Sequence, residues 1–283
     1  MFFPAGALLL VLNFAPALYA VYLSVLDFNY ANLARRTDFV GMRHYVEVLT
    51  DPHFWTAAQH SAVWALGVVP GSFVGGLYFA LLLNEETRAR GVLRTVLLLP
   101  WVTPLVVVAI LWSFILSPGV GLVNDVLVHL GRIDLKYENW LGEPDLALPI
   151  VMGVQVWRWT PFFAITLLAA LQAIPKDVYE AAEIDGAGTV SRFFHVTLPL
   201  LSPVIMVTLL QSLIWSIHNF SLVYIMTGGG PVYSSEVLTT YLWRTAFPNG
   251  QIGQAAAAGG LMMIGLCAIG SLWVLKLLRR TVA

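Results

Sequence analysis

The sequence predicts an all-α membrane protein with about six transmembrane helices. Three observations predict this class: 58% of the 283 residues are apolar, only 11% are charged, and the charged residues cluster between long apolar stretches. A soluble domain carries about 25% charged residues, so this composition excludes a water-soluble enzyme. About 20 apolar residues in a helix cross a bilayer, and stretches of this length recur along the chain.

Six spans are expected by this criterion, at about 4–26, 61–83, 95–117, 148–173, 200–226 and 254–275. No basic residue precedes the first span, so we expect a retained helix rather than a cleaved signal peptide. Pro100 and Pro104 in the third span and Pro161 in the fourth should bend those helices or free carbonyls within them. No internal repeat is evident, and the chain 1–283 is therefore expected to form a single transmembrane domain.

Small residues recur at helical spacing in two of these spans. Gly67, Gly71 and Gly75 share one face of the second span, and Ala255 with Gly259 repeats the pattern in the sixth. Such faces let another helix approach closely, so helix packing explains them. Because a lone subunit has no equal use for both faces, they also predict a second, related subunit.

Charge and cysteine content limit the partners. The formal net charge is −1 and the pI about 6.6, so the chain lacks the basic excess expected of a nucleic-acid-binding protein. The single cysteine, Cys267, lies in an apolar run, which excludes an intrachain disulfide and a cysteine-based zinc site. We expect no nucleic acid and no metal to bind this chain, and lipid to surround it.

Basic residues predict that both termini are cytoplasmic. With that orientation the inner segments hold eight Lys and Arg in 45 residues, and the outer segments hold six in 91. The inner segments are 84–94, 174–199 and 276–283, and the outer ones are 27–60, 118–147 and 227–253. Basic residues are enriched in cytoplasmic loops, which favours this topology.

The inner segment 174–199 predicts a helix-turn-helix outside the bilayer. Gly186 supplies a left-handed stop, Thr189 or Ser191 can cap a second short helix, and Pro199 begins the next span. A membrane-surface helix is one interpretation of this amphipathic segment, but an acidic helix is repelled by the anionic inner leaflet. The acids Asp177, Glu180, Glu183 and Asp185 outnumber Lys176 and Arg192 here. We therefore expect a protein partner.

This segment resembles the cytoplasmic loop of the permease subunits of binding-protein-dependent ABC importers. That loop carries Glu-Ala-Ala, three residues, Gly, nine residues, Ile, one residue and Leu-Pro. Here Glu180-Ala181-Ala182, Gly186, Val196 and Leu198-Pro199 stand at each of these spacings, with only Val in place of Ile. Further similarity lies in Asp185-Gly186-Ala187, in Trp-Thr-Pro-Phe at 159–162 and in Met-Thr-Gly-Gly-Gly-Pro at 226–231.

These features look like the sugar-importer branch related to maltose and glycerol-phosphate permeases, most firmly over about 60–275. The resemblance implies a type I ABC importer permease fold whose cytoplasmic coupling helix contacts an ATPase. The coupling residues it implies are Glu180, Ala181, Ala182, Asp185, Gly186, Ala187, Leu198 and Pro199. It also implies a second permease, two ATPase subunits, an extracytoplasmic solute-binding protein and a bacterial-type cytoplasmic membrane.

The chain itself is not expected to be an enzyme. Gly228-Gly229-Gly230-Pro231 lacks the Lys-Ser/Thr that a phosphate-binding loop requires, so no catalytic residue is assigned. ATP and Mg²⁺ are expected to bind the partner ATPase. The alternative, an ion-coupled secondary transporter, would normally place Asp or Glu within the membrane, and none of the six predicted spans contains either.

The fifth span carries candidate substrate-pathway residues. Gln211, Trp215, His218 and Asn219 stand at i, i+4, i+7 and i+8 and would share one side of a continuous helix. A neutral sugar needs hydrogen-bond partners and an aromatic surface, and this stripe supplies both. Alternatively, these groups hydrogen-bond neighbouring helices.

Arg158 is the one charged residue within a predicted span. If the span began after it, residues 159–173 would cover only about 22 Å of a core about 30 Å thick. Arg158 is therefore a second candidate for the pathway, since intramembrane charges usually face a cavity or a partner. The other interpretation is that Trp157 and Trp159 mark the interface and Arg158 extends outward to it.

Overall fold

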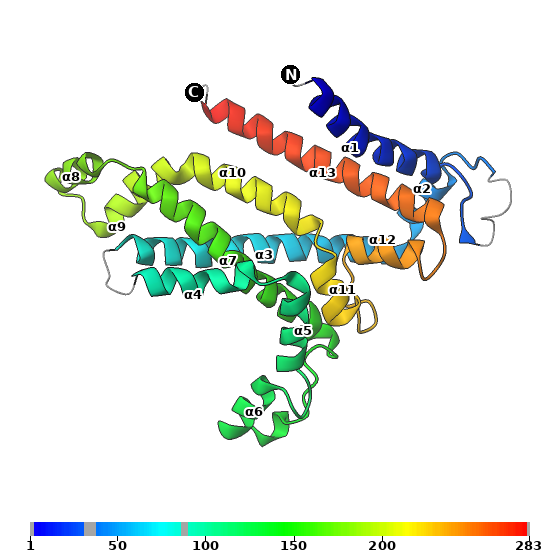
Figure 1. The fold of residues 1–283 in the computed structure, drawn as a ribbon, viewed down its shortest axis with the longest axis horizontal. Helices are drawn as coiled ribbons and strands as arrows, with labels where there is room; N and C mark the ends of the chain where they lie inside the picture. The colour runs from blue at the N-terminus through cyan, green and yellow to red at the C-terminus, as the bar shows by residue number, and fades with distance from the viewer. Residues whose placement is uncertain (1–2, 31–37, 86–89, 282–283) are drawn as a thin grey trace. The chain divides into compact units, whose positions relative to one another are not determined.

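The computed structural model describes residues 3–30, 38–85 and 90–281. Every regular element in these ranges is helical, apart from an isolated bridge between Leu26 and Phe39 (Figure 1). The all-α class predicted from the sequence is confirmed. Arg35, Arg36 and Arg88, which the orientation prediction uses, lie outside the described residues.

Four helical runs among the described residues are long and apolar enough to span a membrane. They are α3 (Pro52–Asn84), α7 (Pro144–Gln172), the run Thr189–Ile217 that ends as α10 (Leu198–Ile217), and α13 (Ile252–Thr281). The bent pair α4 (Arg90–Val102) and α5 (Leu105–Ile115) makes a fifth. The first predicted span corresponds to α1 (Phe3–Ser24). Its described apolar stretch, Leu10–Ser24, is shorter than the four spanning runs.

The third predicted span is bent rather than straight. Its two helices, α4 and α5, meet at 95° across Thr103 and Pro104. Pro104 has no N–H to donate to the carbonyl of Pro100, and it disfavours the helical conformation at the preceding residue. The predicted bend is therefore found here, whereas α7 continues through Pro161 as one helix.

The fifth predicted span is interrupted, which corrects the expectation of one helix over 200–226. α10 ends at Ile217, and the short helix α11 (Ser221–Thr227) begins after a gap. The ring Nδ1 of His218 lies 2.8 Å from the carbonyl oxygen of Ile214. In a continuing helix that carbonyl would accept from the backbone N–H of His218, so the side chain competes with the helix.

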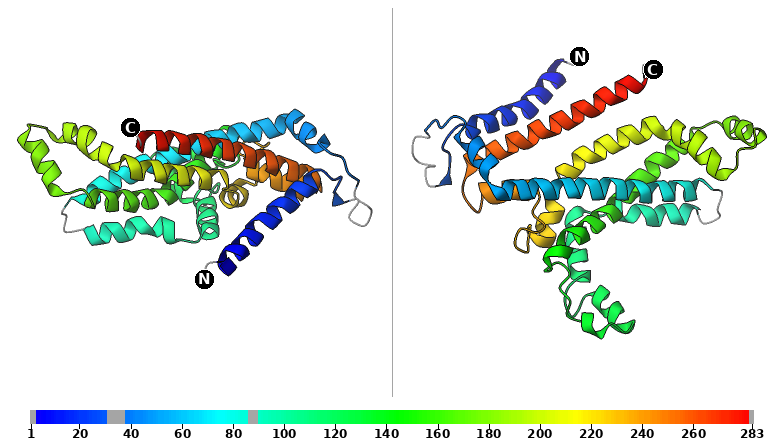
Figure 2. Two further views of the ribbon diagram at one scale, coloured as in Figure 1. Left: turned by 90° about the horizontal axis from the view of Figure 1, so that it is seen from above. Right: turned by 180° about the vertical axis from the view of Figure 1, so that it is seen from behind.

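The chain divides into two compact units, the first comprising 1–61 with 236–283 and the second 62–235. In the first unit α13 packs against α1, α2 (Arg43–Thr50) and α12 (Leu238–Ala246) (Figure 2). Its core contains Val48, Phe54, Ala57, Tyr241 and Ala258.

In the second unit α7 packs against α4, α10 and α11. One core cluster contains Ala80, Leu83, Leu167, Leu168, Leu171 and Leu201. Between α5 and α7 lie α6 (Leu122–His129) and the 3-10 turn η2 (Ile133–Leu135). The buried Asn124 holds this segment together, because its amide donates to the carbonyls of Lys136 and Glu138 at 3.2 and 2.9 Å.

The glycine face of α3 packs against α7 of the same chain. A Cβ added at Gly71 would lie 3.0 Å from a methyl of Val156, and one at Gly75 would lie 3.0 Å from Oγ1 of Thr160. The predicted close helix packing is confirmed. However, a second subunit is not needed to explain this face, which removes one reason given above for expecting such a subunit.

We predict that Gly76→Ala destabilises this packing by roughly 1–3 kcal/mol, the usual cost of overfilling a packed site. The new Cβ would lie 2.3 Å from Cβ of Phe163 and 2.9 Å from the backbone nitrogen of Ala164. Gly153→Ala on α7 is the matched control, because a Cβ there has no neighbour within 4 Å. Thermal unfolding of the detergent-purified chain should show a lower midpoint for Gly76→Ala only, and equal midpoints would contradict the packing.

Candidate functional site

The loop after α7 contains α8 (Lys176–Ile184), which ends in a glycine turn. Gly186 has φ +79°, its N–H donates to the carbonyl of Glu183 at 3.0 Å, and the N–H of Ala187 donates to that of Ala182 at 2.9 Å. These two bonds define a Schellman motif, which satisfies carbonyls at a helix end. The left-handed stop predicted at Gly186 is confirmed.

The second helix of the loop begins differently from the prediction. α9 (Thr189–Arg192) has Gly188 at its N-cap position and no side-chain cap, so the expected cap by Thr189 or Ser191 is wrong. The backbone of Gly188 is extended, and Thr189 is already helical. From α9 the chain passes through a π-helical turn, η3 (Phe193–Thr197), directly into α10, which begins at Leu198.

This loop extends beyond the ends of α3 and α4 (Figures 1 and 2). None of the nine residues of α8 is buried, and apolar side chains on the loop are open to solvent. Ile184 is 86% exposed, Val190 71% and Phe194 56%. Of the predicted coupling residues, Ala182, Ala187 and Leu198 are half-buried, and the exposed ones are Glu180, Ala181, Asp185, Gly186 and Pro199. Exposed apolar surface beside small residues is typical of a protein-binding site.

The stripe predicted on the fifth span is only partly present. Gln211 and Trp215 are exposed on α10, and Trp215 packs against Trp159 and Phe162 of α7 with ring centroids 6.3 and 5.4 Å away. His218 stands at the helix end, and Asn219 follows it, with its backbone N–H donating to Ser216 at 3.2 Å. The helical spacing predicted for all four residues therefore fails after Trp215.

Several polar groups beside this aromatic cluster are unpaired within the described part of the chain. The hydroxyls of Ser212 and Ser216 on α10 are buried without a hydrogen bond, as are Oε1 of Gln155 and Nε of Arg158 on α7. Of the two tryptophans beside Arg158, Trp159 is buried against Trp215 and Trp157 is 40% exposed. Hydrogen bonding to neighbouring helices of this chain does not account for these groups.

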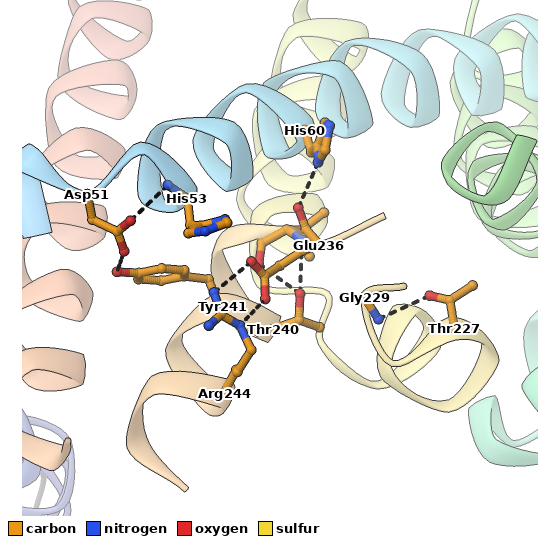
Figure 3. Close-up of polar contacts among 10 residues, drawn as sticks. Asp51, His53, His60, Thr227, Gly229, Glu236, Thr240, Tyr241 and Arg244 are labelled. Atoms are coloured by element: carbon orange, nitrogen blue, oxygen red, sulfur yellow. Dashed lines mark hydrogen bonds and ion pairs between the residues drawn. The ribbon is translucent and has the colours of Figure 1, made fainter. Parts of the chain in front are cut away.

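The first unit contains a polar network that the sequence analysis missed (Figure 3). Glu236 is 3% exposed and accepts two hydrogen bonds from Arg244, at 2.7 and 3.1 Å. The hydroxyl of Tyr241 donates to Asp51 at 2.7 Å, and the guanidinium of Arg244 lies 5.3 Å from the Tyr241 ring. Burial raises the pKa of Tyr241, and the bond to the Asp51 carboxylate raises it further. The Glu236 carbonyl accepts from Nδ1 of His60 at 3.0 Å.

No signal in the sequence predicts this network, because its partners come from three separate elements. Asp51 precedes α3, Glu236 precedes α12, and Tyr241 and Arg244 lie on α12. Among the residues that the structure describes, no group of three His, Cys, Asp or Glu side chains could hold a metal ion.

Apolar helices long enough to span a membrane, with an exposed helix-turn-helix between two of them, are the arrangement expected of a transport permease. The chain belongs to the family of binding-protein-dependent transport system inner membrane components, whose family model matches residues 72–282. The predictions of an ABC importer permease and of its fold are confirmed, as is location in an inner membrane.

Two relatives and one solved structure illustrate the similarity. The trehalose/maltose transport system permease protein MalF of Thermococcus litoralis is 42% identical over 68% of this chain and 64% of its own length. The sulfoquinovosyl glycerol transport system permease protein SmoG of Agrobacterium fabrum is 33% identical over 93% of this chain and 85% of its own. A bacterial ABC transporter involved in the import of the acidic polysaccharide alginate contains a chain 25% identical to this one. The TM-score is 0.84, over 99% of this chain and 94% of that chain.

We predict that Arg244→Leu destabilises the protein by about 3–5 kcal/mol, because it leaves the buried Glu236 carboxylate without its cation. Adding Glu236→Gln should recover part of this loss by removing the charge. Arg132→Leu is the matched control, since Arg132 pairs with Asp134 in full exposure to solvent and should give no measurable change. Thermal unfolding of the three variants checks the prediction, and equal midpoints for Arg244→Leu and Arg132→Leu would contradict it.

Proposed function

We propose that this permease conducts an uncharged sugar or oligosaccharide and that an external solute-binding protein delivers it. The single observation that carries the assignment of an ATPase-coupled permease is the projecting helix-turn-helix, with its Schellman turn at Gly186 and exposed Ile184, while the choice of solute rests on the α7–α10 face. The family description supports a binding protein as a partner. A second permease and two ATPase subunits complete the complex, and both termini of this chain lie in the cytoplasm.

In this proposal α8 is the coupling helix that docks on the ATPase. Ala181 and Ala182 lack bulk, so a groove in the partner can close on the helix backbone, while Ile184 offers an apolar anchor. The remaining coupling residues form the edges of this surface and its junction with α10. They are Glu180, Asp185, Ala187, Leu198 and Pro199. ATP and Mg²⁺ bind the partner subunit, and hydrolysis of ATP there drives transport.

The solute route follows the α7–α10 face. Trp215, packed against Phe162 with the two rings tilted by 52°, offers the C–H face of a sugar an aromatic surface, and Gln211 one turn earlier offers hydrogen bonds. His218 and Asn219 lie at the end of this face rather than on it. An anionic solute would need several cations along the route, and the predicted spans supply Arg158 alone. The name of the Thermococcus relative, a trehalose/maltose permease, supports an uncharged solute, whereas the similar alginate transporter imports an acidic polysaccharide, so the proposal of an uncharged solute rests on the α7–α10 face.

An ion-coupled secondary transporter is disfavoured. The family consists of components of binding-protein-dependent transport systems. Such systems are energised by a separate subunit in this proposal, so no coupling-ion site is needed in the membrane.

One prediction of this proposal concerns coupling. Gly186→Val should uncouple ATP hydrolysis from transport, because a β-branched residue is strained at φ +79° and would distort the end of α8. Ala181→Glu should do the same by adding bulk and charge to the docking face. Gly188→Val is the matched control, since Gly188 has φ −67° and a Cβ there meets nothing within 4 Å.

Reconstitution of the full complex in proteoliposomes checks this prediction. Solute uptake and ATP hydrolysis are measured together, and both uncoupling variants should retain membrane insertion while uptake falls. Normal stimulated hydrolysis and uptake in Gly186→Val and Ala181→Glu would contradict a coupling role for the loop.

A further prediction of this proposal concerns the solute. Gln211→Leu should reduce uptake of an uncharged disaccharide about fivefold at subsaturating concentration, the effect of one lost hydrogen bond of about 1 kcal/mol. Trp215→Ala should reduce uptake more, because it removes the aromatic surface. Gln59→Leu, at an exposed glutamine near the start of α3, is the matched control and should transport normally. Wild-type uptake in both pathway variants, or a cognate binding protein selective for anionic ligands, would overturn the proposal.

A further inference from the structure

The coupling helix α8 has a narrow attachment to the rest of its unit. Among the larger packing contacts between elements, α8 contacts only η3, and none of its nine residues is buried. A cavity of about 600 Å³ lies beside it, lined by the ends of α3 and α7, by Tyr179, and by residues of α9 and η3. Close packing against the spans therefore does not hold α8 in place.

The chain between α8 and α9 is suited to act as a pivot. It contains Gly186 at positive φ and Gly188 in an extended conformation, and a Cβ at either position would meet nothing within 4 Å. Glycine allows a wide range of backbone conformations, so this turn by itself does not fix the angle between the two helices.

Two side-chain contacts cross the glycine turn. The hydroxyl of Tyr179 on α8 lies 3.2 Å from Oγ1 of Thr197, the last residue of η3. The guanidinium of Arg192 at the end of α9 donates to Oε2 of Glu183 on α8 at 3.1 Å. In both pairs one residue precedes Gly186 and the other follows Gly188, so each contact restrains rotation at the turn.

Thr197 connects the contact with α8 to the start of α10. Its side chain is buried, its Oγ1 lies 3.4 Å from the carbonyl oxygen of Arg192, and the next residue begins α10. A displacement of α8 is thereby applied at the first turn of a membrane-spanning helix.

We propose that Tyr179, Thr197, Glu183 and Arg192 form a clasp that makes α8 and the base of α10 move as one body. These are positioning residues, and the inference rests on the proposed coupling role of α8. Without the clasp, a partner that displaces α8 bends the glycine turn instead of moving α10. ATP hydrolysis then continues with less solute transported.

The two contacts contribute unequally to the stability of the clasp. Glu183 is largely exposed, and exposed ion pairs contribute little. The Tyr179–Thr197 bond is partly buried, and Thr197 is fixed by its surroundings. We therefore expect the tyrosine–threonine contact to carry most of the effect.

The test measures solute transported per ATP hydrolysed by the complete complex in proteoliposomes with saturating binding protein. Tyr179→Phe and Thr197→Val each keep the side-chain shape and remove a hydroxyl, and each should lower this ratio about 2- to 10-fold, the range of one net hydrogen bond. Thr197→Ser keeps the hydroxyl and should restore the ratio. Glu183→Arg should lower the ratio less, and Glu183→Arg with Arg192→Glu should recover it.

Asp177→Asn is the matched control, because it neutralises an exposed carboxylate on the same helix that lies outside the clasp. Its ratio should equal that of the wild type. A wild-type ratio in both Tyr179→Phe and Thr197→Val would overturn the clasp. Loss of ATPase co-purification in these variants would also overturn it, because the residues would then serve docking or folding.

A separate variant distinguishes failure of the clasp from failure of the coupling role itself. Ile184→Glu places a charge on the exposed docking face, at a residue that belongs to neither clasp contact, and should release the ATPase from the complex. If Ile184→Glu has no effect on ATPase binding, the proposed role of α8 fails. If it releases the ATPase while the clasp variants transport normally, only the clasp fails.

Discussion

The backbone of a membrane protein has no water to bond with in the hydrocarbon region, and this constraint shapes most of the structure. A helix satisfies each carbonyl with an N–H four residues later, so departures from helix require a substitute donor. At the end of α10 the His218 ring supplies that donor to the carbonyl of Ile214. At the α4–α5 bend the Leu99 carbonyl accepts from both the hydroxyl and the backbone N–H of Thr103. At the end of α10, therefore, the helix stops where a side chain replaces the backbone bond.

The same constraint sets how the helices pack. Lipid tails are as apolar as the side chains, so helix association depends on close contact rather than on burial from water. The α3 glycines allow this contact with Val156 and Thr160 on α7. The sequence predicts the close approach but not the partner, since a face without side chains fits any helix that reaches it. Topology brings α7 of the same chain to this face.

Local features could be predicted better than distant ones. The stop at Gly186 follows from one residue's conformational freedom and the helical pattern before it. The interruption after Ile217 depends on the His218 side chain, which competes for the carbonyl of Ile214. A hydropathy profile does not detect such competition. The Glu236–Arg244–Tyr241–Asp51 network is less predictable still, because Asp51 lies 190 positions from its partner Tyr241. The Trp215–Trp159 contact likewise joins two spans that periodicity alone cannot pair.

The continuity of α9, η3 and α10 gives the loop motif a geometric meaning. From Thr189 to Ile217 the chain is one helical run, with a wide turn at Phe193–Thr197. Each residue in an α-helix advances the side-chain direction by about 100°. The number of residues between Thr189 and Leu198-Pro199 therefore sets how α10 is rotated about its axis relative to α9, so that adding or removing one would change the direction of Gln211 and Trp215 relative to α9. The fixed spacing of the motif thus sets the rotation of the membrane helix about its own axis relative to the second helix of the cytoplasmic loop.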